Sequence, residues 1–147
     1  MKLAKCYNVQ MKTRNVAILL LENDGKILLQ KRSMNAKRFA GKWGLFGGGI
    51  EEGETPELGL RREISEELNL KLKYVRQIHA LDYTLDRTSE KGTIFTFYAQ
   101  YNSEKLDLNE GDEMRWVSFN EALIYDLSPD YRKVLEHISQ NREVMVL

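Results

Sequence analysis

Three glutamates near the middle of the chain have a spacing that suits metal binding. Glu63, Glu66 and Glu67 are three and four positions apart, so on a helix their carboxylates project from one face within reach of one another. Each such like-charged pair destabilises an isolated helix by roughly 0.2–0.5 kcal/mol. A divalent metal ion would offset this repulsion, whereas a solvated acidic face is the alternative interpretation.

The segment that carries these glutamates has the signals of a helix. Thr55 can cap its first turn, and Pro56 follows at the first helical position, where its missing N–H costs no hydrogen bond. Leu60, Ile64 and Leu68 recur every four residues and form an apolar stripe beside the acidic one. We expect the apolar face to pack in the core while the acidic face stays free to bind a ligand.

Glycines and cations precede this helix. Residues 47–49 are all glycine, and with Gly53 they predict a loop whose main chain comes close to a ligand, as glycine-rich turns do around phosphates. Residues 31–42 form a basic stretch that leads into the glycines and would attract a polyphosphate, although a solvated loop is the alternative. The substrate-binding candidates in this stretch are Lys37, Arg38 and Lys42.

Taken together, these features resemble the Nudix box, the signature of the Nudix hydrolase family, written G-x5-E-x7-R-E-U-x-E-E-x-G-U with U an aliphatic residue. The matching positions are Gly48, Glu54, Arg62, Glu63, Ile64, Glu66, Glu67 and Leu70. Asn69 departs from the pattern, because the family has glycine there. Asparagine is the residue best tolerated after glycine in the left-handed conformation that ends many helices, so we expect the box to be functional.

The resemblance implies a metal site at the matching positions. Glu66 and Glu67 are implied as metal ligands, Glu63 as a ligand or orienting group, and a main-chain carbonyl near Gly48 as a further ligand. Magnesium takes oxygen ligands, usually one or two protein carboxylates plus substrate phosphate oxygens and water. Such an ion neutralises phosphate charge and acidifies an attacking water. Mg2+ is therefore the expected cofactor, with Mn2+ as the alternative.

Two further catalytic roles follow from the resemblance. Arg62 is implied to clamp the carboxylate of Glu54, although a weak salt bridge with Glu66 is the alternative. The general base must lie within reach of the attacking water.

Candidates for that base are Glu63 and a later acid, because an acidic residue before a Trp-containing strand joins the metal site in family members. Glu110 and Glu113 precede Trp116, and we favour Glu110 over an exposed loop carboxylate.

The composition favours one cytoplasmic catalytic domain. A chain of 147 residues is close to the commonest domain size, so we expect a single Nudix hydrolase domain over residues 1–147. A formal net charge of zero argues against a general nucleic-acid or membrane binder. Cys6 is alone, and the apolar run at residues 16–21 is too short for a signal peptide or a membrane span. The oligomeric state, a homodimer included, is left open.

Hydrophobic patterns predict strands interleaved with helices. Residues 16–22 and 26–31 flank Asn23, Asp24 and Gly25, which is a hairpin signal. Further strands are expected at residues 71–81, 92–101 and 114–119. Asn120 is expected to cap a short helix at residues 121–124, and Pro129 to open a last helix that reaches about residue 141. This order predicts an α/β or α+β layered fold, and the resemblance implies the Nudix fold, a mixed β-sheet sandwiched between α-helices.

The sequence gives less information about the substrate than about the fold or the metal site. Aromatic residues on or beside predicted strands would stack a base: Tyr83, Phe95, Phe97 and Tyr98. The turn at residues 127–130, which contains Asp130, resembles the stretch that recognises the base in family members that hydrolyse oxidised nucleotides. A box-complete chain of this size most resembles members that cleave (deoxy)nucleoside triphosphates to the monophosphate and pyrophosphate. The alternatives are an RNA 5′-end pyrophosphohydrolase and a non-catalytic nucleotide-binding sensor, and the complete box carboxylates favour an enzyme.

Overall fold

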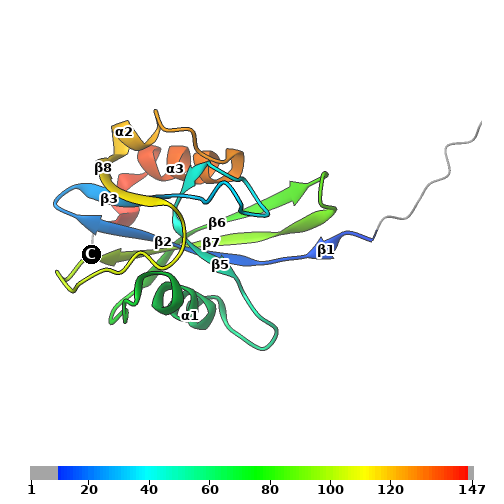
Figure 1. Cartoon of the computed structure of the whole chain (residues 1–147), viewed down its shortest axis with the longest axis horizontal. Coiled ribbons are helices and arrows are strands. Elements are labelled where there is room, and N and C mark those ends of the chain that lie inside the picture. The colour runs from blue at the N-terminus through cyan, green and yellow to red at the C-terminus, as the bar shows by residue number, and fades with distance from the viewer. Residues whose placement is uncertain (1–9, 146–147) are drawn as a thin grey trace, which may run out of the picture.

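A mixed β-sheet lies between helices in the computed structural model, which describes residues 10–145 (Figure 1). Helix α1 (Pro56–Leu68) covers one face, and helices α2 (Phe119–Ala122) and α3 (Pro129–Gln140) cover the other. Two apolar cores fill the spaces between the sheet and these two helical layers. The predicted sheet between helices is therefore confirmed, whereas Cys6 lies outside the described residues. None of the helices in residues 10–145 has the length and apolar character needed to span a membrane.

The sheet has eight strands, with a buried strand at its centre. Strand β2 (Val16–Asn23) runs parallel to β7 on one side and antiparallel to β5 and β3 on the other. The remaining strands extend the sheet: β6 pairs with β7, β1 with the start of β7, and β8 and β4 with β3. Their bounds are β1 Lys12–Thr13, β3 Lys26–Lys31, β4 Trp43–Gly44, β5 Phe46–Gly49, β6 Arg76–Leu85, β7 Glu90–Gln100 and β8 Glu113–Ser118.

The predicted hairpin between β2 and β3 is present. Asp24 and Gly25 form the two-residue turn, with φ of 51° and 77°. Positive φ at both positions is what a type I′ turn requires, and its twist matches that of the paired strands. Asn23 belongs to β2 rather than to the turn, because it pairs with Lys26.

Several predicted boundaries differ from the structure, and two of the differences have a clear local cause. The strand expected at residues 71–81 begins only at Arg76, because Arg61 donates hydrogen bonds to the carbonyls of Leu72 and Lys73 and these carbonyls do not join a sheet ladder. The apolar side chains before Arg76 pack in the core beside α1 instead. Helix α2 starts at Phe119 because Ser118, not Asn120, accepts the capping hydrogen bond from the N–H of Glu121 at 3.2 Å.

Helices α1 and α3 lie close to where the sequence predicts them. Thr55 caps α1 by accepting a hydrogen bond from the N–H of Leu58 at 3.2 Å. Helix α3 ends at Gln140, one residue before the predicted end, and a short 3-10 helix, η1 (Arg142–Met145), follows it. The Thr55 cap of α1, proline at the first position of both helices, and apolar periodicity are sufficient to define them, although Ser128 makes no capping hydrogen bond at the start of α3.

Asn69 ends helix α1 in the left-handed conformation, with φ of 53° and ψ of 33°. Its side-chain amide donates a hydrogen bond to Asp107 at 3.1 Å. We expect Asn69→Gly to be nearly neutral, because glycine relieves the backbone strain while the exposed hydrogen bond is lost. Asn69→Val should lower stability by about 1 kcal/mol or more, because a β-branched residue is strained at positive φ. Thermal melting of both variants is the measurement, and equal melting temperatures would contradict this role.

Candidate active site

The glycine run forms a strand, not the predicted loop. Residues 47–49 belong to β5 and pair with β2, with Gly48 opposite Ala17. Gly47 has φ of 140°, and a Cβ there would lie 2.1 Å from the Ala17 carbonyl oxygen. A Cβ on Gly48 would lie 2.6 Å from the carboxyl carbon of Glu63. The absence of side chains therefore lets β5 lie close to β2 and lets the Glu63 carboxylate lie against the main chain.

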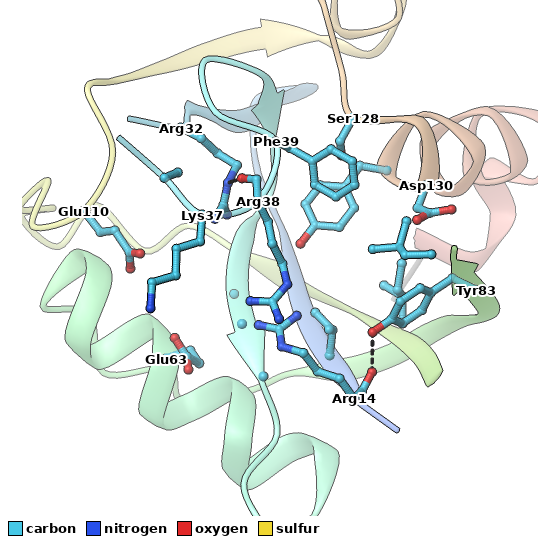
Figure 2. A pocket seen from close by; sticks show the side chains of 18 of the residues that line it. Arg14, Arg32, Lys37, Arg38, Phe39, Glu63, Tyr83, Glu110, Ser128 and Asp130 are labelled. Atoms are coloured by element: carbon cyan, nitrogen blue, oxygen red, sulfur yellow. Dashed lines mark hydrogen bonds between the residues drawn. The ribbon is translucent and has the colours of Figure 1, made fainter. Parts of the chain in front are cut away.

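The predicted carboxylates divide into two groups. Glu63 and Glu67 line a cavity of about 350 Å³ together with Glu110 from the loop before β8. Glu67 is 3% exposed and accepts a hydrogen bond from the Gly47 N–H at 2.9 Å. The side chain of Glu66, in contrast, is 61% exposed and lies 3.6 Å from Arg62. Glu63 and Glu110 point into the cavity from opposite sides (Figure 2).

Of the two acids before Trp116, the structure brings Glu110 to the cavity. Glu113, the first residue of β8, instead pairs with Arg115 at 2.5 Å. The preference for Glu110 is thus consistent with the geometry, and its role as the base stays a prediction.

Two carboxyl groups of the cavity, those of Glu63 and Glu67, have pKa values above that of an ordinary glutamate. Burial, and after it the negative charges of Glu110 and Glu63, raise the pKa of Glu67 to about 9, while the hydrogen bond from the Gly47 N–H opposes the shift. Burial also raises the pKa of Glu63, although the hydrogen bond from Arg62 opposes this. A bound cation would favour the ionised form of both carboxyl groups and so oppose these shifts.

This donor set fits a hard divalent cation such as Mg2+. All three side chains offer carboxylate oxygens, and Mg2+ needs only one or two protein carboxylates because water and substrate phosphates complete its coordination. Within residues 10–145, no three His, Cys, Asp or Glu side chains already stand close enough to enclose an ion by themselves. The site therefore suits an ion that arrives with water and phosphate ligands rather than one held in a closed protein cage.

We expect Glu67 to make the metal-free protein less stable as the pH rises. An unfolded glutamate loses its proton near its ordinary pKa of 4.5, whereas folded Glu67 keeps it until about pH 9. Between these values the folded state binds more protons than the unfolded state, so raising the pH favours unfolding. In chelator, Glu67→Gln should melt near the wild-type temperature at pH 5 and above it at pH 8.5. Parallel melting curves across this range would contradict the buried position of this carboxylate.

Arg62 connects helix α1 to the segment before it. Its guanidinium donates to both carboxylate oxygens of Glu54, at 2.8 and 2.9 Å, and to the Gly49 carbonyl at 2.9 Å. It also donates to Glu63 at 2.9 Å. This geometry matches the predicted clamp on Glu54, and its longer 3.6 Å contact with Glu66 is secondary. One arginine thus fixes the glycine strand, the preceding loop and a cavity carboxylate relative to one another.

The basic stretch contributes two of its three predicted residues to the cavity. Lys37 and Arg38 line it, and Figure 2 shows Lys37 reaching toward the gap between Glu63 and Glu110. Lys42 is not among the lining residues, and its ammonium binds the exposed carboxylate of Asp126 at 2.9 Å. The structure thus corrects the expectation for Lys42, because its charge is neutralised away from the cavity.

The opposite end of the cavity has an aromatic and polar lining. Tyr83 and Asp130 line it, as the sequence suggested, together with Phe39 (Figure 2). Burial raises the pKa of Asp130. The other predicted aromatics do not line this cavity and pack in the two cores: Phe95, Phe97 and Tyr98.

Sequence reasoning missed one arginine of the cavity, Arg14, which precedes β2 and has no motif around it. Arg32, which also lines the cavity, belongs to the basic stretch at residues 31–42 but was not among its named candidates. The pairing of β2 with β5 brings Arg14 beside the glycine strand, and no local pattern reports this.

The sequence of this chain is similar to those of known proteins. The family model of the NUDIX domain matches residues 11–138. A nucleoside triphosphatase, NudI, of Escherichia coli O17:K52:H18 is 34% identical over 135 residues, covering 85% of this chain and 96% of that protein. The NudI of Escherichia fergusonii is 35% identical over 136 residues, with the same coverage of 85% and 96%.

Two solved structures have a fold similar to that of this chain. The crystal structure of a MutT protein from Methanosarcina mazei Go1 has a TM-score of 0.80 and 26% identity, covering 92% of this chain and 99% of that one. The solution structure of the E. coli ORF135 protein has a TM-score of 0.77 and 28% identity, covering 90% and 92%.

Proposed function

The chain belongs to the Nudix hydrolase family, and on this premise we propose that it hydrolyses a (deoxy)nucleoside triphosphate to the monophosphate and pyrophosphate with Mg2+. The observation that carries the proposal is the order of groups along one cavity. Glu63, Glu67 and Glu110 lie at one end, and Tyr83 and Asp130 at the other. A nucleotide has the same order, with a charged phosphate chain at one end and a base at the other. We take residues 1–147 to act as a single catalytic domain.

The residues at the acidic end of the cavity would have different roles in hydrolysis. Glu66 and Glu67 would hold Mg2+, with Glu63 as a ligand or orienting group and a main-chain carbonyl near Gly48 as a further ligand. The ion when bound neutralises phosphate charge and acidifies the attacking water.

Glu110, which lines the same end of the cavity close to Glu67, would accept a proton from that water. The Lys37 ammonium would balance the terminal phosphate charge, and the Arg62 clamp keeps Glu63 in position.

The other end of the cavity suits a nucleobase. Tyr83 and Phe39 offer aromatic surface, which contributes about 1–3 kcal/mol when a base stacks on it. The carboxylate of Asp130 can accept hydrogen bonds from donors at a base edge. These groups support recognition of a nucleobase, an oxidised one included, at this end of the cavity.

The alternatives have less support. An RNA 5′-end pyrophosphohydrolase would need cations beyond the cavity to hold the nucleic-acid chain, and Lys42, the predicted cation that lies outside it, is paired with Asp126. A non-catalytic sensor would not need Glu67 to be buried beside other acids at a cost in stability.

A substrate panel tests the proposal. Purified protein is incubated with each nucleoside triphosphate, 8-oxo-dGTP, ADP-ribose and a 5′-triphosphate RNA, with Mg2+ or with chelator. We expect monophosphate and pyrophosphate from at least one triphosphate, and no turnover in chelator. Turnover of ADP-ribose or RNA alone would reject the substrate class, and turnover in chelator would reject the metal chemistry.

A further inference from the structure

We propose that Arg14, together with Arg38, grips the phosphate next to the nucleoside, while Lys37 meets the terminal phosphates. The two cationic groups would thus divide the substrate's phosphate chain between them. This inference rests on the proposed function, because it assigns parts of a nucleoside triphosphate to positions along the same cavity.

The main chain at Arg14 is held tightly. Its N–H donates to the Lys91 carbonyl at 2.8 Å, and its carbonyl accepts from the Tyr83 hydroxyl at 2.5 Å. Gly92 allows this close approach, because a Cβ there would lie 2.1 Å from the Arg14 carbonyl oxygen. The side chain therefore starts from a fixed point at the junction of β2, β6 and β7.

The Arg14 guanidinium lies against the glycine strand. A Cβ on Gly49 would lie 3.3 Å from the nearest Arg14 nitrogen, whereas one on Gly48 would meet the Glu63 carboxylate. Successive glycines of β5 thus carry a guanidinium and a carboxylate close to them. Within residues 10–145, Arg14 has no carboxylate in ion-pair range, and the nearby carboxylate of Glu90 is already paired with Arg38.

Arg38 is fixed beside it by different contacts. Its guanidinium makes a two-pronged ion pair with Glu90, whose side chain is 9% exposed. Arg32 donates to the Arg38 carbonyl at 2.7 Å, which holds the loop that carries it. The charges of both Arg38 and Arg14 help to lower the pKa of Glu90, so both arginines lie near this carboxylate. Two guanidiniums and one carboxylate leave one excess positive charge, which matches the single charge of an internal phosphate.

The position of Arg14 and Arg38 along the cavity determines which phosphate of the substrate they would contact. Figure 2 shows Arg14 and Arg38 between the Glu63 and Glu110 end and the Tyr83 and Asp130 end. A base at Tyr83 places the first phosphate over the two arginines and the terminal phosphates near the acids and Lys37. The two cationic groups should therefore be separable by ligands that contain only one end of the phosphate chain.

Binding of the two reaction products, measured by calorimetry with Mg2+, tests this division. The probes are AMP, GMP, CMP and UMP for one end, and inorganic pyrophosphate for the other. We expect Arg14→Gln to weaken monophosphate binding about 10-fold or more, since charged hydrogen bonds are lost, and to change pyrophosphate binding less than about twofold. Lys37→Gln should weaken pyrophosphate binding about 10-fold or more and change monophosphate binding less than about twofold. Arg14→Gln should also raise KM by the same factor for a diphosphate and a triphosphate, because both contain the first phosphate.

Arg14→Lys and Arg87→Gln are the controls. Lysine keeps the charge without the planar fork, so it should restore part of the affinity for the monophosphate. Arg87 is exposed in the turn between β6 and β7, and its variant should bind both products like the wild type. Equal losses for both products in Arg14→Gln, or no loss for the monophosphates, would overturn the assignment. A wild-type protein that binds neither product would instead overturn the proposed function itself.

Discussion

Replacing Glu67 by glutamine should lower kcat by at least about 100-fold while the protein keeps its fold and binds nucleotide. A metal ion supplies several kcal/mol of transition-state stabilisation, and each 1.4 kcal/mol corresponds to about tenfold in rate. The amide keeps the volume of the carboxylate and can still accept from the Gly47 N–H at 2.9 Å. Glu67 is only 3% exposed, so no outside group can replace its charge. Steady-state kinetics at saturating Mg2+ measure the loss.

The same substitution should stabilise the protein in chelator. Without a cation, the folded protein at pH 8 must keep Glu67 protonated, which lowers its stability because the unfolded chain has lost this proton. Glutamine is neutral in both states, so the variant should have a higher melting temperature at pH 8. Activity and stability would then change in opposite directions, as expected where a site carries strain for its function. Glu57→Gln is the matched control on the same helix, because Glu57 is half-exposed and, among residues 10–145, forms an ion pair only with Arg61. Wild-type kcat in Glu67→Gln would reject the metal-ligand assignment.

Local sequence signals were sufficient for helix α1 and the groups it carries. Thr55 and Asn69 mark its ends, and the spacing of Glu63 and Glu67 follows from helix geometry, so all of these could be predicted. Glu66 shows the limit of the same reasoning. Its spacing places it on the acidic face, but only the packing of α1 against β5 decides that its side chain is 61% exposed.

The parts that sequence reasoning missed depend on contacts between distant segments. Glycine is rare in strands, so residues 47–49 predict a loop, and only their pairing with β2 makes them a strand. Arg14 is likewise brought to the cavity by the pairing of β1 and β2 with neighbouring strands. The prediction for Lys42 failed for the same reason, since its partner Asp126 is 84 residues away in the chain.

Replacing Arg62 by lysine should lower kcat/KM about 10- to 100-fold although the positive charge is kept. Removing a group that hydrogen-bonds to a metal ligand and orients it typically lowers metal affinity or activity about 10- to 100-fold. Lysine cannot reproduce the two parallel hydrogen bonds to Glu54 together with those to Gly49 and Glu63. The affinity for Mg2+ should fall as well, because Glu63 loses the group that orients it. Kinetics over a range of Mg2+ concentrations separate the two effects.

Arg61→Ala is the control that separates a site effect from a loss of stability. Arg61 is the neighbouring arginine on α1, and it also binds two segments, through Glu57 and through the carbonyls of Leu72 and Lys73. Both variants should lower the melting temperature, since each loses charged hydrogen bonds that contribute about 2 kcal/mol. Only Arg62→Lys should lose activity, because the Arg61 contacts lie away from the cavity. Equal losses of activity at matched stability would mean that Arg62 supports the helix alone, and that the box arginine has no separate part in orienting the metal site.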